Sequence, residues 1–351
     1  MTPLGDRPLP SHPKRPLVLA PMAGGPSTPR LCAAVCDAGG LGFLAAGYLT
    51  PDKLVSDIAE LTELTDAAYG VNIFVPGEPA PAGSLEVEFA TYRDRLIADG
   101  TYPADLFPEL PQWSTDYYEE KIDIVAASSA AYVSFVFGHP DISVIRRLQE
   151  AGKAVVLYAT SRPGIRAIAD SPAAVIGIQS VYAGGHRATV EGMDDDSAEE
   201  LSTLIGFARG ISDKPIIAGG GVSGPADVRA ILDAGATAVQ VGTLFLTTHE
   251  AGTRTTHREA LLATPERATM LTRSFSGRPA RTIENEFARR HSADAPALYP
   301  YLHYLTTRMR AAADRVGDPE HLNLWAGTGF AGCRALSAAD LVAELTAGDS
   351  R

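Results

Sequence analysis

Short apolar runs alternate with amphipathic segments along most of this chain. Eight runs of four to six residues are apolar at nearly every position, which is typical of strands buried on both faces of a parallel sheet. The segments between them carry apolar residues three and four apart, which predicts helices. The predicted strands are 17–20, 41–45, 70–74, 132–135, 154–159, 174–178, 215–218 and 238–241, and the predicted helices are 29–37, 51–64, 141–150, 163–170, 197–206 and 226–234.

The ends of these segments carry the residues that begin and end helices. Thr28 can cap the helix that starts at Pro29, and Gly39 follows its last turn. Strand–helix alternation repeated eight times predicts an α/β fold, a closed (β/α)8 TIM barrel. An open doubly wound sheet is the alternative architecture for the same pattern.

Two stretches lie outside the repeat. Residues 76–114 follow the third predicted strand, begin with several prolines and contain aromatic residues that include Tyr92, Tyr102, Phe107 and Trp113. We expect an ordered insertion that either walls a pocket or decorates the surface. Residues 264–351 follow the eighth strand, and we expect a C-terminal helical segment packed on a barrel that spans residues 1–263.

Composition narrows the class of protein. The chain has 351 residues and a formal charge of −12, so a nucleic-acid partner is not expected. No apolar run approaches the roughly 20 residues that span a bilayer, and no membrane partner is expected. Cys32 and Cys36 lie four apart on a predicted helix as small buried hydrophobes. Three cysteines in all suggest reduced thiols and a cytoplasmic location. A monomer and a homodimer both remain open.

Three glycine clusters follow predicted strands, where the loops of a barrel build its site. Residues 21–25, Pro-Met-Ala-Gly-Gly, follow the first strand. Gly219-Gly220-Gly221 follow the seventh strand, and Gly242-Thr243 follow the eighth, just after Gln240. Loops after strands seven and eight often bind phosphate together, because glycine lets backbone amides approach the anion. The sequence therefore predicts a phosphate site there.

Polar residues also stand at the ends of two other strands. The sixth strand runs into a segment from Gln179 to His186 that contains Gly184 and Gly185. The glycines allow the chain to lie against a planar ligand, and a histidine on this face can move a proton near neutral pH. Asn72 interrupts the apolar third strand, and a buried amide needs a partner. No cluster of histidines and cysteines has zinc spacing, so no metal is expected.

At these residues the sequence resembles the nitronate monooxygenases, formerly called 2-nitropropane dioxygenases. The resemblance covers most of the chain and includes segments 134–140, 274–281 and 324–327. It implies a barrel that binds flavin mononucleotide (FMN) and oxidises alkyl nitronates or nitroalkanes with O₂. By position, it places FMN against Pro21, Met22, Ala23, Asn72, Gln179, Gly184, Gly185, Gly219, Gly220, Gly221, Gln240, Gly242 and Thr243.

The same resemblance makes His186 the catalytic base or an orienting residue. Ser180 and Tyr182 replace the Gly and Glu of the usual family segment, and Val136 stands where some members have histidine. These departures fall where the substrate should lie. The expected pocket residues are Val136, His139, Tyr182, Tyr299 and His303.

The expected reaction converts a small nitronate and O₂ into a carbonyl compound and nitrite, and the flavin carries the redox chemistry. An NAD(P)H-dependent FMN enoyl reductase is the alternative within flavoenzymes, because such enzymes resemble this chain at the Ala-Gly-Gly-His and glycine-cluster positions. A flavin- or phosphate-binding barrel without turnover is the alternative from another class.

Overall fold

Eight parallel strands form the barrel that the alternating pattern predicts. The structure is a computed structural model that describes residues 9–10, 13–81, 83–190 and 198–348. The strand order is β1-β9-β8-β6-β5-β4-β3-β2, and a bridge between Val18 and Leu41 joins β1 to β2. The strands are β1 (Leu17–Leu19), β2 (Gly42–Ala45), β3 (Tyr69–Phe74), β4 (Tyr132–Val136), β5 (Ala154–Ala159), β6 (Val175–Gln179), β8 (Ile216–Gly219) and β9 (Ala238–Val241).

Helices pack around the strands and bury one face each. Thr28 accepts a hydrogen bond from the Leu31 amide at 3.0 Å, which confirms the predicted cap of the first helix. The helix expected at 197–206 instead runs from Leu201, and residues 191–197 lie outside the described residues. The covering helices are α1 (Pro29–Asp37), α2 (Pro51–Leu64), α4 (Tyr118–Ala127), α5 (Ile142–Glu150), α6 (Arg162–Asp170), α7 (Leu201–Ile211) and α8 (Pro225–Asp233).

The sequence pattern did not predict α4, which supplies the helix after β3. Its inward face carries Tyr118, Ile122 and Val125, but Lys121 occupies the fourth position of that face. Lys121 is only 1% exposed. A charged residue in the core-facing stripe weakens the periodic signal on which such predictions depend.

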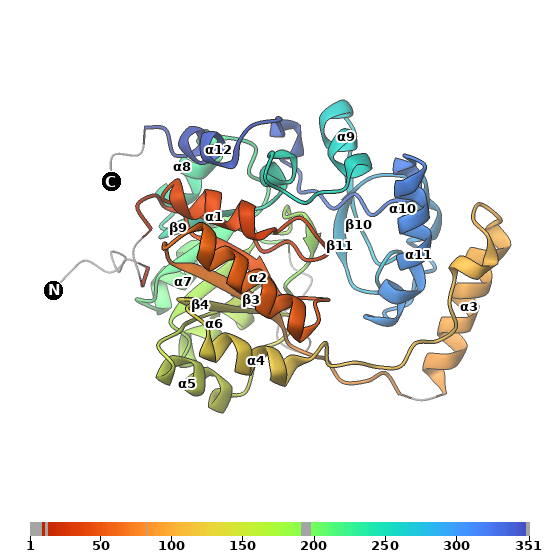
Figure 1. The fold of residues 1–351 in the computed structure, drawn as a ribbon, viewed down its shortest axis with the longest axis horizontal. Coiled ribbons are helices and arrows are strands. Elements are labelled where there is room, and N and C mark those ends of the chain that lie inside the picture. The colour runs from red at the N-terminus through yellow and green to blue at the C-terminus, as the bar shows by residue number, and fades with distance from the viewer. Residues whose placement is uncertain (1–8, 11–12, 82, 191–197, 349–351) are drawn as a thin grey trace.

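The insertion forms a long helix, α3 (Ser84–Asp99), followed by the short η1 (Ala104–Leu106). Figure 1 shows α3 at one end of the molecule, beside the C-terminal helices and away from most of the barrel. It buries Leu85, Phe89 and Tyr92 in a cluster with residues of the C-terminal segment. The insertion therefore packs on the C-terminal segment more than on the barrel.

The C-terminal segment contains two strands as well as the expected helices. Strands β10 (Thr269–Thr272) and β11 (Ala280–Ile283) are antiparallel, and β11 pairs with β7 (Gly185–His186). Gly185 and His186 are thereby held in a small second sheet. The other elements after β9 are η2 (Thr243–Thr247), α9 (Thr255–Ala263), α10 (Glu286–His291), α11 (Tyr301–Arg315), η3 (Pro319–His321), η4 (Phe330–Gly332) and α12 (Ala338–Leu345).

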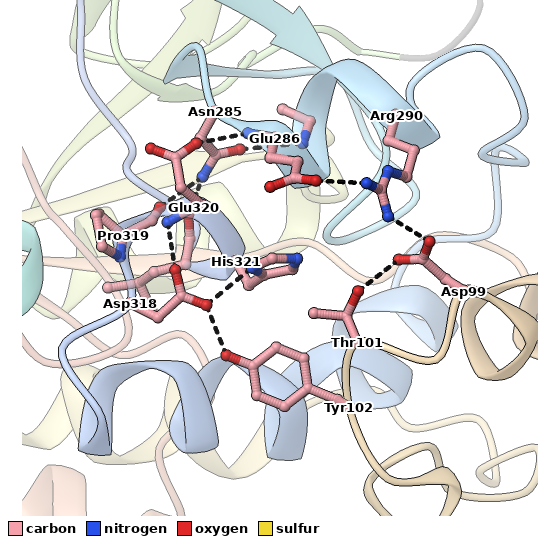
Figure 2. Close-up of polar contacts among 12 residues, drawn as sticks. Asp99, Thr101, Tyr102, Asn285, Glu286, Arg290, Asp318, Pro319, Glu320 and His321 are labelled. Atoms are coloured by element: carbon pink, nitrogen blue, oxygen red, sulfur yellow. Dashed lines mark hydrogen bonds and ion pairs between the residues drawn. The ribbon is translucent and has the colours of Figure 1, made fainter.

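Paired charges and hydrogen bonds join the insertion to this segment, as Figure 2 shows. Asp99, at the end of α3, pairs with Arg290 of α10. The Tyr102 hydroxyl donates to Asp318 at 2.8 Å, and His321 contacts the same carboxylate at 2.8 Å. We call this group of contacts the junction.

The three cysteines are buried and unpaired, as expected for Cys32 and Cys36. Within the described residues, no helix is both long and apolar enough to cross a membrane. The same residues contain no group of three or more His, Cys, Asp or Glu side chains that could hold a metal ion.

Candidate active site

A cavity of about 410 Å³ opens at the carboxyl ends of the barrel strands. Residues that follow strands from around the barrel line it, together with residues of α9 and α11 and of the segment near Trp325. The structure brings most of the sequence-predicted residues together there. Those lining the cavity are Pro21, Met22, Ala23, Asn72, Val136, Gln179, Gly184, Gly185, His186, Gly219, Gly220, Gly221, Gln240, Gly242, Thr243 and His303.

The glycine loops after β8 and β9 emerge side by side. Gly219 lies opposite Gln240 in the parallel ladder, so the two loops leave the sheet at the same level. Gly220 and Gly221 have φ values of 123° and 81°, which favour glycine. A Cβ atom on Gly220 would lie 2.8 Å from the Ala183 side chain, and one on Gly219 would lie 2.1 Å from the Gln240 carbonyl oxygen. Only backbone fits here, which suits close approach to a phosphate.

The three cavity amides also hold protein groups. The Gln179 side chain donates to the His186 carbonyl at 3.0 Å and accepts from the Ala188 amide at 2.8 Å. It thereby fixes the strand that carries His186. Asn72 donates to the Ser134 hydroxyl at 2.9 Å, and Gln240 donates to the Tyr158 hydroxyl at 2.8 Å. Each amide is held in one orientation at the cavity wall.

His186 is surrounded by aromatic rings and one hydroxyl. Phe137, Trp325 and Tyr299 place their ring centroids 5.4–5.8 Å from the imidazole. Its Nε2 lies 2.8 Å from the Ser276 Oγ. Burial, and then the charges of Arg278 and Arg310, lower the pKa of His186 to about 3. The imidazole is therefore neutral at physiological pH.

The cavity has a positive electrostatic environment although the chain is acidic overall. Arg254 and Arg310 line it, and none of the described lining residues is Asp or Glu. Arg310 is 6% exposed and donates to Thr306, Thr307 and Asn323 at 2.9–3.2 Å. These acceptors are neutral, so they bring no countercharge to Arg310. Because a buried charge without a countercharge is costly, the arrangement favours an anionic ligand.

Several lining residues were not predicted from the sequence. Tyr48 follows β2, and its ring stacks on His303 with centroids 4.0 Å apart. Arg254 and His257 come from the region of α9, and Arg310 comes from α11. Tyr48 could have been predicted as a lining residue from the sequence. The segment Ala-Gly-Tyr that ends at Tyr48 follows a predicted strand, as the glycine clusters do. Arg254 and Arg310 had no such signal, because the segments that carry them reach the cavity only through tertiary packing.

Three expected pocket residues do not line the cavity. Tyr182 is 37% exposed, and its hydroxyl donates to Glu200 at 2.9 Å. The His139 Nε2 lies 3.3 Å from the Tyr158 carbonyl oxygen. Tyr299 lies behind the cavity wall, with its hydroxyl 3.0 Å from that of Tyr48. His139 and Tyr299 each contact a lining residue, Tyr158 and Tyr48 respectively.

The insertion does not wall the cavity: no described residue of 76–114 lines it. The reason is that its apolar face packs on the C-terminal segment. It still reaches the site indirectly, because the buried Tyr92 hydroxyl donates to the Ser274 carbonyl at 2.8 Å. Thr306 of α11 donates to the neighbouring Phe275 carbonyl at 2.6 Å. Together these bonds hold the loop that carries Ser276.

Comparison with known proteins agrees with this geometry. The family model of nitronate monooxygenase matches residues 10–348. The chain belongs to the nitronate monooxygenase family. A probable nitronate monooxygenase of Bacillus subtilis is 34% identical over 319 residues, which cover 90% of each chain. A nitronate monooxygenase of Pseudomonas aeruginosa is 33% identical over 339 residues, which cover 95% of each.

Solved structures of similar proteins confirm the barrel. Nitroalkane oxidase from Streptomyces ansochromogenes superposes with a TM-score of 0.88 at 40% identity over 95% of both chains. FabK from Thermotoga maritima gives a TM-score of 0.69 at 22% identity over 94% of this chain and 91% of that one, a likeness of fold alone. Membership of the family makes the protein an oxidoreductase, implies a flavin cofactor, and supports oxidation of nitronates or nitroalkanes.

Proposed function

We propose that this protein binds FMN in the cavity and uses O₂ to oxidise alkyl nitronates to carbonyl compounds and nitrite. The observation that carries the proposal is a neutral histidine in a cationic cavity whose described lining contains no Asp or Glu, at the strand ends where the glycine loops converge. Such a cavity suits two anions, the phosphate of the cofactor and the nitronate.

The residues present fit FMN. The loops of Gly219–Gly221 and Gly242–Thr243 would hold the phosphate with backbone amides, because side chains have no room there. Residues 21–23, Asn72, Gln179, Gly184, Gly185 and Gln240 line the rest of the cavity and would hold the ring system. When bound, the flavin supplies the redox chemistry, and the protein supplies position and electrostatics.

His186 would orient the substrate and hold a proton. The Ser276 hydroxyl has the Arg278 carbonyl as an acceptor at 3.2 Å. When it donates there, its oxygen accepts from Nε2–H of His186, and Nδ1 is left as the basic nitrogen. The low pKa of His186 makes it a weak base, so we favour the preformed nitronate over the neutral nitroalkane as substrate.

The positive charges then act on the substrate itself. Arg278 and Arg310 lower the pKa of His186, so their field reaches the imidazole. The same field stabilises a nitronate anion bound beside it. The aromatic rings around His186 keep water from the anion and strengthen this attraction.

The test compares three substrates with purified, yellow protein. We expect nitrite release and O₂ uptake with propionate-3-nitronate and with alkyl nitronates, and slower turnover with the matching nitroalkanes at equal concentration. Mixed anaerobically with nitronate, the flavin spectrum should change. Rapid anaerobic reduction by NADPH without nitronate turnover would instead indicate an enoyl reductase. Colourless protein that does not bind added FMN would contradict the proposal.

A further inference from the structure

Four residues other than glycine have positive φ values, and they gather near one wall of the cavity. They are Tyr48, Asp116, Tyr117 and Phe137, at 66°, 57°, 56° and 73° within the described residues. Tyr48 and Phe137 line the cavity. Side chains rarely adopt this conformation, and it persists only where the surroundings impose it. Something must therefore hold Tyr48 in place.

An ion pair of the part-buried Asp116 with the buried Lys121 holds the backbone of Tyr48. Its amide donates to both carboxylate oxygens of Asp116 at 3.2 Å. Asp116 lies 2.7 Å from the Lys121 ammonium, and Lys121 is 1% exposed. Burial raises the pKa of Asp116 and lowers the pKa of Lys121, so both charges are costly to bury. A buried ion pair contributes little net stability. The position of Tyr48 therefore explains this pair better than a gain in stability does.

Three neighbouring side chains hold the Tyr48 side chain. Its ring stacks on His303 at 4.0 Å and meets the edge of Phe74 at 5.3 Å. Its hydroxyl lies 3.0 Å from the Tyr299 hydroxyl. Burial raises the pKa of both phenols, so both stay neutral across the physiological range. Between two such hydroxyls only one hydrogen is shared, and the other remains to be donated.

We propose that Tyr48 donates this hydrogen to an oxygen of the anionic substrate, and that Asp116 and Lys121 are positioning residues for it. When the Tyr299 hydroxyl donates to Tyr48, the Tyr48 hydroxyl is left for the ligand. The ligand must be an anion, because cations and neutral donors line this cavity and, in its described part, carboxylates do not. This inference rests on the proposed function for the identity of the anion, a planar nitronate.

The first experiment removes only the hydroxyl, in Tyr48→Phe. Nitrate is the probe, because it is a planar oxyanion that the enzyme does not consume. Calorimetric titration should show nitrate binding weakened about tenfold, the usual loss for one hydrogen bond to a charged group. KM for nitronate should rise by a similar factor, with a smaller change in kcat. Tyr69→Phe is the matched control. Tyr69 begins β3, at the end of the strand away from the cavity, and its hydroxyl hydrogen-bonds Ser129 at 3.0 Å.

The second experiment tests the ion pair. Asp116→Asn with Lys121→Met removes both charges together, so neither is left buried alone. We expect weaker nitrate binding, and we expect Tyr48→Phe to add little further loss in this background, because residues of one unit are not additive. A merely structural pair would lower the unfolding temperature while leaving the full effect of Tyr48→Phe in place, and that result would overturn the positioning role.

The outcomes separate this inference from the proposed function. Nitrate binding that depends on Tyr48, in a protein that turns over no nitronate, would support the binding role and remove the proposed reaction. Turnover of nitronates with wild-type KM and wild-type nitrate affinity in a folded Tyr48→Phe variant would overturn the inference and leave the reaction standing. Wild-type protein that binds no nitrate at millimolar concentration would also overturn it.

Discussion

Two polar regions of this molecule differ in the partners of their charged groups. At the junction, each charged group shown in Figure 2 meets an opposite charge or a hydrogen-bond partner, such as Asp99 with Arg290 and Asp318 with Tyr102 and His321. In the cavity, Arg310 donates only to neutral groups, and no described lining residue is acidic.

The difference separates structural charges from functional ones. The junction carboxylates are stabilised as anions: burial alone would raise the pKa of Asp318, but hydrogen bonds from Tyr102, the Glu320 amide and His321 bring it below its ordinary value. In the cavity, burial and nearby arginines lower the pKa of His186 and of His303, so the site resists protonation. The paired charges of the junction join two segments of the chain. The cavity arginines, which donate to neutral groups, favour the binding of an anionic ligand.

The largest expected effect comes from His186→Gln. We expect kcat for nitronate to fall about 10²-fold or more, because the imidazole that orients the substrate for reaction is lost. The flavin content of the purified protein should stay unchanged, because the phosphate loops are untouched. Steady-state O₂ uptake measures the loss. A variant with near wild-type kcat would show that His186 takes no part in the reaction.

The next effect tests the uncompensated charge. Arg310→Met should lower kcat/KM for nitronate about 10- to 100-fold, because a charge-assisted contact is lost. Arg308→Met is the matched control on the same helix, since Arg308 is exposed and does not line the cavity. Nitrite assays over a range of nitronate concentrations measure both variants. Equal losses in the two would mean that Arg310 does not act on the substrate.

A third effect appears in the pH dependence of stability. The folded protein holds His186 neutral down to about pH 3, whereas the unfolded chain protonates it below about 6.5. Stability should therefore fall as pH drops from 6.5 toward 3, by at most about 1.4 kcal/mol per pH unit for one group. Urea unfolding between pH 4 and 6.5 should show a shallower slope in His186→Gln.

Asp318 supplies the contrast in the same measurement. Because its folded pKa is lowered, its contribution is complete above the unfolded value of about 3.9 and is lost below it. Asp318→Asn should leave the slope between about pH 5 and 6.5 unchanged and flatten it only at lower pH. A changed slope above about pH 5 in this variant would break the distinction between the two regions.

The smallest effect is on the junction at neutral pH. Asp318→Asn should reduce the free energy of unfolding by about 1 kcal/mol, since hydrogen bonds to a charged acceptor become neutral ones. Nitronate turnover should not change, because no described junction residue of Figure 2 lines the cavity. A turnover loss would show that the junction acts on the site, through the loop that Tyr92 holds.

Periodicity predicted the barrel well because each of its signals is local. The eight predicted strands match the observed ones to within one or two residues, and Thr28 caps the helix where expected. Helix α4 was missed because Lys121 occupies a core-facing position. The strands of the C-terminal segment were missed because β10 and β11 are short and each contains polar residues, so they lack an apolar run.

The candidate site likewise contains residues that the sequence could predict and residues that it could not. Residues that follow strands, such as Gly219–Gly221 and His186, could be predicted, because a parallel barrel brings all strand ends to one face. Tyr48, Arg254 and Arg310 needed the tertiary structure. Their roles come from partners distant in sequence, as when Asp116 fixes Tyr48 and α11 carries Arg310 to the cavity.

The sequence by itself determined the strand–helix repeat, the glycine loops and the histidine at the end of the sixth barrel strand. Each of these depends on residues that are close together in the sequence. Only the tertiary structure decided the charge of the cavity and the place of the insertion. Electrostatic balance depends on which side chains lie within a few ångströms of each other, and packing sets those distances between segments that the chain keeps far apart.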